Sequence, residues 1–165
     1  MKKVPVQFTL NGEDIAEFID SGTTLLAALR ERIGTFSSKG GCHQGTCGAC
    51  TVIVDGRLQL GCLTLAESCE NRSVETLESL GDASHLHPLQ EAFMTEFAAQ
   101  CGYCTSGMIL AAKALLDRNP DPNRAEVEEA IAGNICRCTG YQPIIAAILS
   151  AARKINGADT DRMTA

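Results

Sequence analysis

Apolar and polar residues alternate near the start of the chain, with apolar side chains at every second position: Val4, Val6, Phe8 and Leu10. This period of two predicts a half-buried β-strand, and Asn11-Gly12 directly after it is a strong signal for a two-residue hairpin turn. Between residues 24 and 32 the spacing becomes helical, with apolar side chains on one face: Leu25, Leu29 and Ile33. Gly34 stands where the C-cap of that helix belongs.

A second hairpin is indicated further along the chain. All residues of the segment 51–54 are β-branched, which favours a strand. Asp55-Gly56 supplies a turn, and residues 57–60 are expected to form the returning strand. The segment 74–77 could supply a last strand. These elements predict a small mixed sheet packed on one helix.

The pattern changes from about Gly81, where strands are no longer indicated. Four short helices are predicted to start at Pro88, at Ser106, near Asn123 and at Pro143. Apolar residues recur at four-residue steps in the first of them, and we expect two of these in the core: Phe93 and Phe97. Short helices joined by brief connections favour a bundle.

The end of the third helix is expected near Gly133, and its start is marked by Asn123 with Glu126, a capping-box-like pair. The last eight residues, ADTDRMTA, are expected to form a loose tail. The predicted fold class is therefore α+β, with a strand-rich domain over residues 1–80 and a helical domain over residues 81–165.

The amino-acid composition and net charge exclude several classes of protein and partner. With 45% hydrophobic and 21% charged residues among 165, the chain is neither disordered nor fibrous. A net charge of -6 argues against a nucleic-acid partner. The longest apolar run, residues 144–149, is too short to span a bilayer, and no signal peptide is indicated. We therefore expect a cytoplasmic protein, in which the nine cysteines serve metal binding or catalysis rather than disulfides.

Four cysteines follow the spacing C-x4-C-x2-C-x11-C: Cys42, Cys47, Cys50 and Cys62. The first three reproduce the plant-type [2Fe–2S] spacing. Glycines crowd the same loop, and their conformational freedom lets backbone N–H groups point at sulfur. Two alternatives stay open, a zinc site and a glycine loop with incidental thiols, although zinc favours C-x2-C pairs. A Rieske centre is excluded because it needs two histidine ligands, and only His43 lies nearby.

A second set of four cysteines lies in the predicted helical region: Cys101, Cys104, Cys136 and Cys138. Each pair stands just before a predicted helix, where the positive end of the helix dipole and free N–H groups favour an anionic cluster. A bundle that brings two such helix ends together makes a four-thiolate site. Buried structural cysteines and zinc remain the alternatives, although C-x-C is not a usual zinc-finger spacing.

Three segments carry a family resemblance: GGCHQGTCGACTVIVDG, QCGYCTSGM and GNICRCTGYQPI. They resemble the iron–sulfur subunit, or the N-terminal iron–sulfur part, of the molybdenum hydroxylases. That family includes xanthine dehydrogenase, aldehyde oxidoreductase, aerobic carbon monoxide dehydrogenase and the N-heteroaromatic hydroxylases. The resemblance runs from about Val4 to Ile155 and covers all eight family cysteines. It implies a β-grasp, plant-type ferredoxin-like domain followed by a four-helix-bundle domain, each with one [2Fe–2S] cluster.

The resemblance also implies a function. Electrons from a molybdenum-pterin centre on a large subunit would pass through the second cluster and then the first, one at a time. They would next reach FAD on a medium subunit, or another acceptor, in a heterotrimer or its dimer. Gln100 and Cys138 would lie near the pterin, and the chain itself would hold no substrate site. Carbon monoxide, purines, aldehydes, N-heteroaromatics and aromatic thioesters all remain candidate substrates of the complex.

Two rival functions are a free-standing ferredoxin-type redox carrier and a zinc-stabilised scaffold. The predicted helical domain argues against the first, because a simple plant-type ferredoxin needs only the strand-rich domain. No G-x-G-x-x-G, P-loop or G-x-S-x-G motif is present, so no nucleotide site or serine nucleophile is indicated. Cys69 is expected to be a buried structural cysteine, with replacement of Cys62 as ligand as the alternative. The family usually has proline at position 106, where Ser106 could cap the helix instead. His85 and His87 are expected to be polar residues of the linker.

Overall fold

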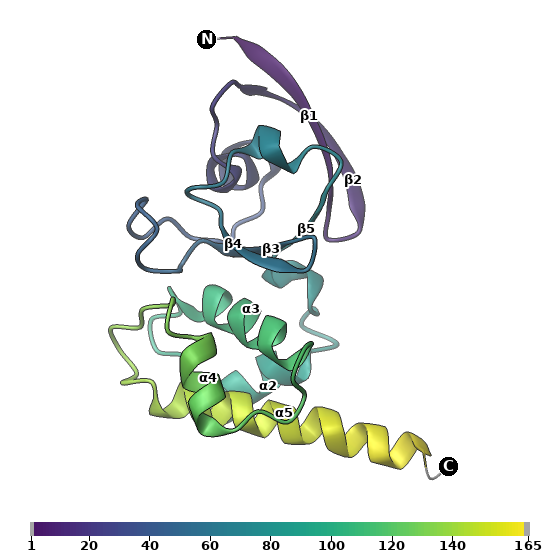
Figure 1. Cartoon of the computed structure of the whole chain (residues 1–165), viewed down its shortest axis with the longest axis vertical. Helices are drawn as coiled ribbons and strands as arrows, with labels where there is room; N and C mark the ends of the chain where they lie inside the picture. The colour runs from purple at the N-terminus through teal and green to yellow at the C-terminus, as the bar shows by residue number, and fades with distance from the viewer. Residues whose placement is uncertain (1, 164–165) are drawn as a thin grey trace.

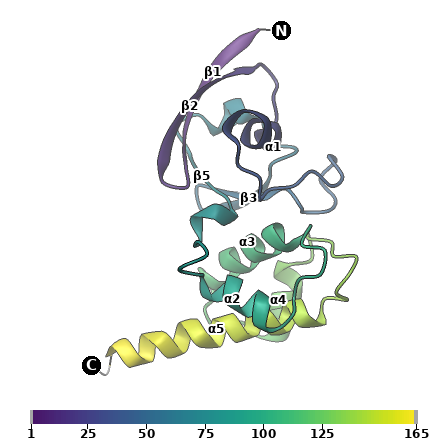
Figure 2. The same ribbon diagram turned by 180° about the vertical axis from the view of Figure 1, so that it is seen from behind.

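The computed structural model describes residues 2–163, and the side chains as far as residue 157. The strand-rich part, residues 2–79 (the sheet lobe), stacks on the helical part, residues 88–163 (the helical lobe), as Figure 1 shows. The two chain ends lie at opposite extremes of the molecule, which is seen from behind in Figure 2. Among the described residues, none of the helices combines the length and the apolarity that a membrane crossing requires.

Five strands form one mixed sheet in the order β2-β1-β5-β3-β4. Their bounds are β1 Lys3–Leu10, β2 Glu13–Asp20, β3 Thr51–Val54, β4 Arg57–Leu60 and β5 Ser73–Glu75. Only the β1–β5 pair is parallel; the others are antiparallel. Both predicted hairpin turns are confirmed, because Asn11 and Asp55 adopt φ of 53° and 48° and a glycine follows each. A positive φ at both central residues is what a type I′ turn needs.

The single helix predicted for the sheet lobe is confirmed, but it is not a regular α-helix throughout. Helix α1 (Leu25–Ala27) continues as a wider, π-helical turn, η1 (Ala28–Ile33). Thr24 caps its start by accepting a hydrogen bond from the Ala27 amide at 3.2 Å, and Gly34 ends it at φ 87°. Its apolar face packs with β1, β3 and β5 into a core built largely of fully buried side chains: Phe8, Leu25, Leu29, Val52 and Val74.

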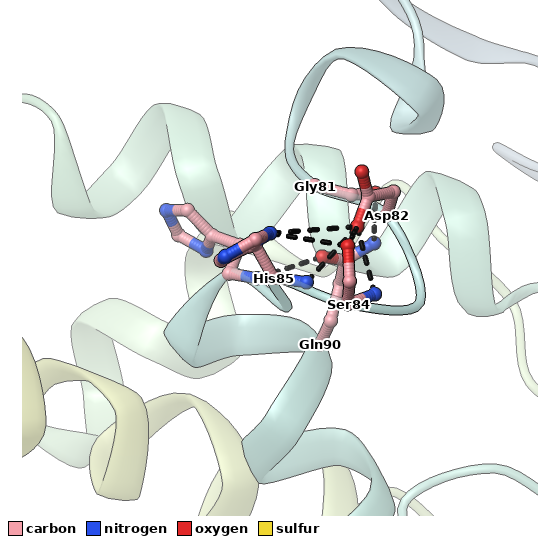
Figure 3. A network of polar contacts seen from close by, with 6 residues as sticks. Gly81, Asp82, Ser84, His85 and Gln90 are labelled. Carbon is pink, nitrogen blue, oxygen red and sulfur yellow. Dashed lines mark hydrogen bonds and ion pairs between the residues drawn. The ribbon is translucent and has the colours of Figure 1, made fainter.

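Two short 3₁₀ turns, η2 (Ala66–Cys69) and η3 (Leu77–Ser79), flank β5, and a tight turn then leads into the helical lobe. Figure 3 shows that the Asp82 carboxylate stabilises this turn. It accepts hydrogen bonds from the amides of Ser84 and His85 at 2.7 and 2.9 Å. His87 is the N-cap of the next helix, and its Nδ1 accepts from the Leu89 amide at 3.2 Å. Both histidines therefore serve the connection, as expected.

The helical lobe contains α2 (Pro88–Thr95), α3 (Thr105–Leu116), α4 (Arg124–Ala130) and α5 (Gln142–Met163). The capping box of α4 is confirmed, with Asn123 and Glu126 each accepting from the other's amide. Helix α3 packs directly against β3, so the helical lobe contacts the sheet lobe through this helix (Figure 1). The core of this lobe includes fully buried side chains from α2, α3 and α5: Leu89, Met108, Ile144 and Ile148.

Phe93 is buried as predicted, but the prediction that Phe97 lies in the core is wrong, because its exposed fraction is 81%. The physical reason is that α2 ends two residues before Phe97, which adopts φ 53°. The Ala98 amide then reaches back to the Phe93 carbonyl at 2.9 Å, in the manner of a helix C-cap. This reversal turns the Phe97 side chain away from the helix face that Phe93 continues.

Two further expectations need correction. Ser106 does not cap α3, because the helix starts at Thr105 and the buried Ser106 hydroxyl instead donates to the Ser37 carbonyl at 2.5 Å. The tail expected to be loose is helical as far as Met163, since extending an existing helix costs far less than starting one. The last two residues of that segment, 164 and 165, lie outside the described residues.

Candidate metal centres

The first cysteine set begins in an irregular loop between η1 and β3. Residues that adopt positive φ bend this loop: His43, Gly45 and Gly48 at 54°, 84° and 69°. A side chain at Gly41 would place its Cβ only 2.8 Å from the Cys47 sulfur. The glycine is therefore needed for the close approach of a candidate ligand to the backbone, which is one of the uses of glycine in such loops.

Hydrogen-bond donors surround the Cys42 sulfur. The amides of Gln44 and Thr46 lie 3.5 and 3.3 Å from it. Hydrogen bonds from the Thr46 side chain and the Gln44 backbone lower the pKa of Cys42 to about 5. A thiolate is thus stabilised before any metal is bound, as iron coordination requires.

Cys50 and Cys62 form the inner half of the first set. Both thiols are buried, and they pack together against Leu26 of α1. Burial raises the pKa of Cys50 to about 11, with a hydrogen bond between the two thiols adding to that rise. Cys62 lies just beyond β4, as its place after the second hairpin predicts.

Cys69 lies apart from this group. Its side chain is fully buried in the sheet core beside Ala66, and its thiol donates weakly to the Leu65 carbonyl at 3.8 Å. Burial raises its pKa. This environment is that of a structural cysteine, the reading that the sequence favours.

The second set is assembled from two separate segments. Cys101 and Cys104 immediately precede α3, whereas Cys136 and Cys138 lie in the loop between α4 and α5. The sulfurs of Cys101 and Cys138 are 3.6 Å apart at the surface. Cys104 and Cys136 pair beneath them, and burial together with their mutual hydrogen bond raises the pKa of Cys104 to about 12.

Donors also surround the Cys136 sulfur. Its partner is Thr139, whose amide and hydroxyl lie 3.4 and 3.0 Å from it. Burial acts to raise the pKa of Cys136, but these hydrogen bonds outweigh it and hold the pKa below the ordinary value. Such contacts to ligand sulfurs are a main way in which proteins set cluster potentials. The spacing of the cysteines does not indicate a role for Thr139, nor for Thr46, which donates to Cys42.

Six of the eight candidate ligands lie in pairs of neighbouring thiols. A tetrahedral zinc site needs four ligands around one centre, whereas a [2Fe–2S] cluster takes two thiolates on each of two irons. The pairs Cys104–Cys136, Cys101–Cys138 and Cys50–Cys62 fit the second requirement.

Comparison with known proteins bears directly on both sets. Residues 7–95 match the family described as "2Fe-2S iron-sulfur cluster binding domain", and residues 76–149 match the "[2Fe-2S] binding domain" family. The chain is 44% identical over 153 residues to the nicotine 6-hydroxylase small subunit of Paenarthrobacter nicotinovorans, covering 93% of this chain and 92% of that one. It belongs to the iron–sulfur subunit family of the molybdenum hydroxylases.

Solved structures of molybdenum hydroxylases agree with this. The crystal structure of quinoline 2-oxidoreductase from Pseudomonas putida 86 contains a chain with a TM-score of 0.91 and 41% identity, covering 95% of this chain and 98% of that one. The aldehyde oxidoreductase of Megalodesulfovibrio gigas is 42% identical over 152 residues, but the match covers only 17% of its length. An iron–sulfur subunit of this family therefore corresponds to a short part of that longer relative.

Gln100 lies in the loop between α2 and α3 and is exposed, directly before Cys101. Because Cys101 meets Cys138, the two residues expected near a pterin, Gln100 and Cys138, share one surface of this iron–sulfur subunit. Sequence reasoning missed Tyr141, whose hydroxyl accepts from the Cys136 amide at 3.0 Å and so orders the ligand loop. Tyr141 lies in the segment GNICRCTGYQPI that carries the family resemblance, but the spacing of the cysteines alone indicates no role for it.

Proposed function

We propose that this chain is the electron-transfer subunit of a molybdenum-containing hydroxylase or dehydrogenase. It would relay single electrons from the molybdenum-pterin centre of a large subunit, through two [2Fe–2S] clusters, to FAD on a medium subunit or to another acceptor. The observation that carries the proposal is the gathering of eight thiols into two separate sets, one in each lobe, within a chain of this family.

Cys42, Cys47, Cys50 and Cys62 would hold the first cluster, and Cys101, Cys104, Cys136 and Cys138 the second. Each cluster supplies a centre that accepts and releases one electron. The chain's own residues stabilise the anionic sulfurs through amide and hydroxyl donors, chiefly at Cys42 and Cys136. The buried halves of the sets exclude water, which is a further lever on cluster potential.

The exposed Cys101–Cys138 pair suits a contact with the large subunit. Both thiols are exposed, as is Gln100, whose amide can both donate and accept a hydrogen bond. We place the molybdenum pterin of the partner near Gln100 and Cys138. The relatives named as small subunits support an assembly of several chains, which we propose to be a heterotrimer or its dimer.

The proposal also assigns a domain type to each lobe. Residues 1–80 would form the β-grasp, plant-type ferredoxin-like domain, and residues 81–165 the four-helix-bundle domain. No catalytic residue is assigned to this chain, because substrate would be oxidised on the large subunit. The thiol-rich composition supports a cytoplasmic location.

The test is to purify the chain anaerobically from cells that also express its native partners. Iron and acid-labile sulfide in equal amounts, two distinct EPR signals after reduction and co-elution with a molybdenum-containing large chain are expected. Changing Cys50 or Cys104 to serine should remove one EPR signal each and leave the other. Zinc without sulfide would refute the proposal.

A free-standing ferredoxin-type carrier is the second candidate, and the plant-type spacing of the first cysteine set favours it. It predicts a chain that elutes near 17.5 kDa in native extracts and carries both clusters without a large partner. Size-exclusion chromatography of the untagged protein therefore distinguishes the two functions.

A further inference from the structure

Helix α2 ends in a backbone turn that strains one of its residues. The Phe97 amide donates to the Met94 carbonyl at 3.3 Å, and the Ala98 amide donates to the Phe93 carbonyl at 2.9 Å. These two hydrogen bonds form a Schellman motif, which needs a left-handed residue at the position of Phe97. Phe97 adopts φ 53°. Glycine is the usual residue at this position, because a Cβ makes the left-handed conformation unfavourable and a bulky side chain there is an outlier.

The Phe97 side chain contributes little to the fold in return for this strain. The apolar contact that accompanies the motif is made by its neighbours, since Phe93 and Ala98 are both buried in the core of the helical lobe. Phe97 itself is 81% exposed, so most of its ring stays in water. Its backbone conformation and its side chain therefore both cost stability in the isolated chain, which is typical of a position that serves a function.

A second large apolar side chain belongs to the same turn. Met94, whose carbonyl accepts the hydrogen bond from the Phe97 amide, is 66% exposed. Single exposed apolar residues are common on protein surfaces and need no explanation. An exposed aromatic ring and a methionine on one turn are, in contrast, the residue types enriched where proteins bind one another. The turn therefore has the composition of an interface.

This turn adjoins the surface that the proposed function assigns to the large subunit. Gln100 follows Phe97 by three residues, which span at most about 11 Å of chain. Cys101 then meets Cys138, and Figures 1 and 2 show the loop from α2 to α3 on the same side of the helical lobe as the loop from α4 to α5. An interface of ordinary size buries about 800 Å² on each partner, a round patch of about 16 Å radius. A subunit that covers Gln100 and Cys138 therefore reaches Phe97.

Resting on the proposed function, we propose that Phe97 anchors this chain to the large subunit by inserting its ring into an apolar pocket of that partner, with Met94 beside it. Buried aromatic anchors carry much of the binding energy of protein interfaces. Binding then recovers the burial of the ring that the isolated chain lacks. A second copy of this chain suits the site less well, because two chains of net charge -6 repel one another.

The test uses the full chain with its clusters assembled and the native molybdenum-containing large subunit purified separately. Biolayer interferometry measures the dissociation constant, and thermal unfolding at equal cluster loading measures the stability of the iron–sulfur chain alone. Phe97→Gly should weaken binding by about tenfold or more, because the anchor is lost. The same variant should raise the unfolding midpoint by about 2–4 °C, because the strain is relieved. A residue with only a structural role would not change the two quantities in opposite directions.

Two further variants separate the ring from the backbone. Phe97→Asn removes the ring but keeps the turn, since asparagine tolerates the left-handed conformation. It should lose as much affinity as Phe97→Gly, which excludes a loosened loop as the cause. Phe97→Tyr keeps the ring and should retain most of the affinity.

Phe18→Thr is the matched control, because it removes another exposed phenylalanine, 63% exposed, and threonine suits a strand. Phe18 lies in β2, at the sheet edge opposite the strands β3 and β4 on which α3 packs. Its loss should leave the dissociation constant within about twofold of the wild-type value.

An unchanged dissociation constant in Phe97→Gly and Phe97→Asn would overturn the inference. So would a lower unfolding midpoint in Phe97→Gly, which would show that the ring serves the fold. Dimers of the isolated chain that Phe97→Asn abolishes, without any loss of affinity for the large subunit, would assign the ring to a second copy instead. Each of these results leaves the proposed function intact, because the complex still forms. A wild-type chain that does not bind the large subunit would instead refute the proposed function.

Discussion

Replacing Gly107 with alanine tests how closely the two lobes approach. Gly107 lies in the first turn of α3, beneath the first cysteine loop. An added Cβ would be 2.3 Å from the Gly48 carbonyl oxygen and 2.8 Å from the Asn134 amide nitrogen, whereas ordinary contacts are 3.4–4 Å. Both neighbours are held by hydrogen bonds, so the helix and the loop must separate by about 1 Å to reach ordinary packing.

Two opposing terms decide the size of the effect. Alanine favours the helix over glycine by at most about 1 kcal/mol. Overpacking against backbone costs about 1–3 kcal/mol. The displaced Gly48 carbonyl also loses the Asn134 hydrogen bond, which contributes about 1 kcal/mol. The cost outweighs the gain, and we expect a net destabilisation of about 1–3 kcal/mol.

Thermal unfolding at equal cluster loading and a fixed scan rate measures this difference. For a chain of this size, 1 kcal/mol corresponds to about 2–4 °C, so the midpoint of Gly107→Ala should fall by roughly 2–12 °C. Gly157→Ala in α5 is the matched control, because no described atom outside the neighbouring helix backbone lies within 4 Å of its added Cβ. Its midpoint should rise slightly, since only the helix preference acts.

A Gly107→Ala midpoint equal to or above that of the wild type would refute the reasoning. It would show that the contact between α3 and the first cysteine loop is looser than described. The hydrogen bond from the Ile135 amide to the Cys47 carbonyl, 2.9 Å long, depends on the same separation of the lobes and would have to be reconsidered with it.

Three further outcomes are expected. In the chain stripped of iron, iodoacetamide should modify Cys42 first, with a rate that rises as pH increases through about 5, because hydrogen bonds to its sulfur lower its pKa; peptide mapping that finds Cys50 first would contradict this. Glu78→Ala should destabilise the chain by about 1–3 kcal/mol in thermal unfolding, because this carboxylate accepts from both the amide and the hydroxyl of Ser37. Cys69→Ala should keep both EPR signals, whereas Cys62→Ala should lose the signal of the first cluster; an EPR spectrum unchanged by Cys62→Ala would exclude that ligand.

Features set by neighbouring residues could be predicted from the sequence. The period of two in β1, the glycine turns and the capping box of Asn123 and Glu126 are all local, and the structure confirms each of them. The spacing of the cysteines also identified two sets. These patterns work because the interactions that decide them lie within a few residues along the chain.

Features set by distant residues could not be predicted. The pairing of Cys101 with Cys138 depends on how α3 and the loop before α5 pack, which no spacing encodes. Ser106 was expected to act on its own helix and instead binds Ser37 in the other lobe. Phe97 fits the helical period, but the helix ends before it, and the C-cap geometry rather than the period decides its exposure.

The Gly48 carbonyl has a consequence for redox chemistry. It accepts from the Thr51 amide at 3.1 Å, the Thr51 hydroxyl at 2.7 Å and the Asn134 side chain at 2.9 Å. Three donors on one oxygen make the Gly48–Ala49 peptide, one residue beyond Cys47, stiff, and its dipole is already oriented before a charge arrives. A rigid surrounding needs little rearrangement when an electron enters or leaves, so the thermal barrier to each transfer stays low without any moving part.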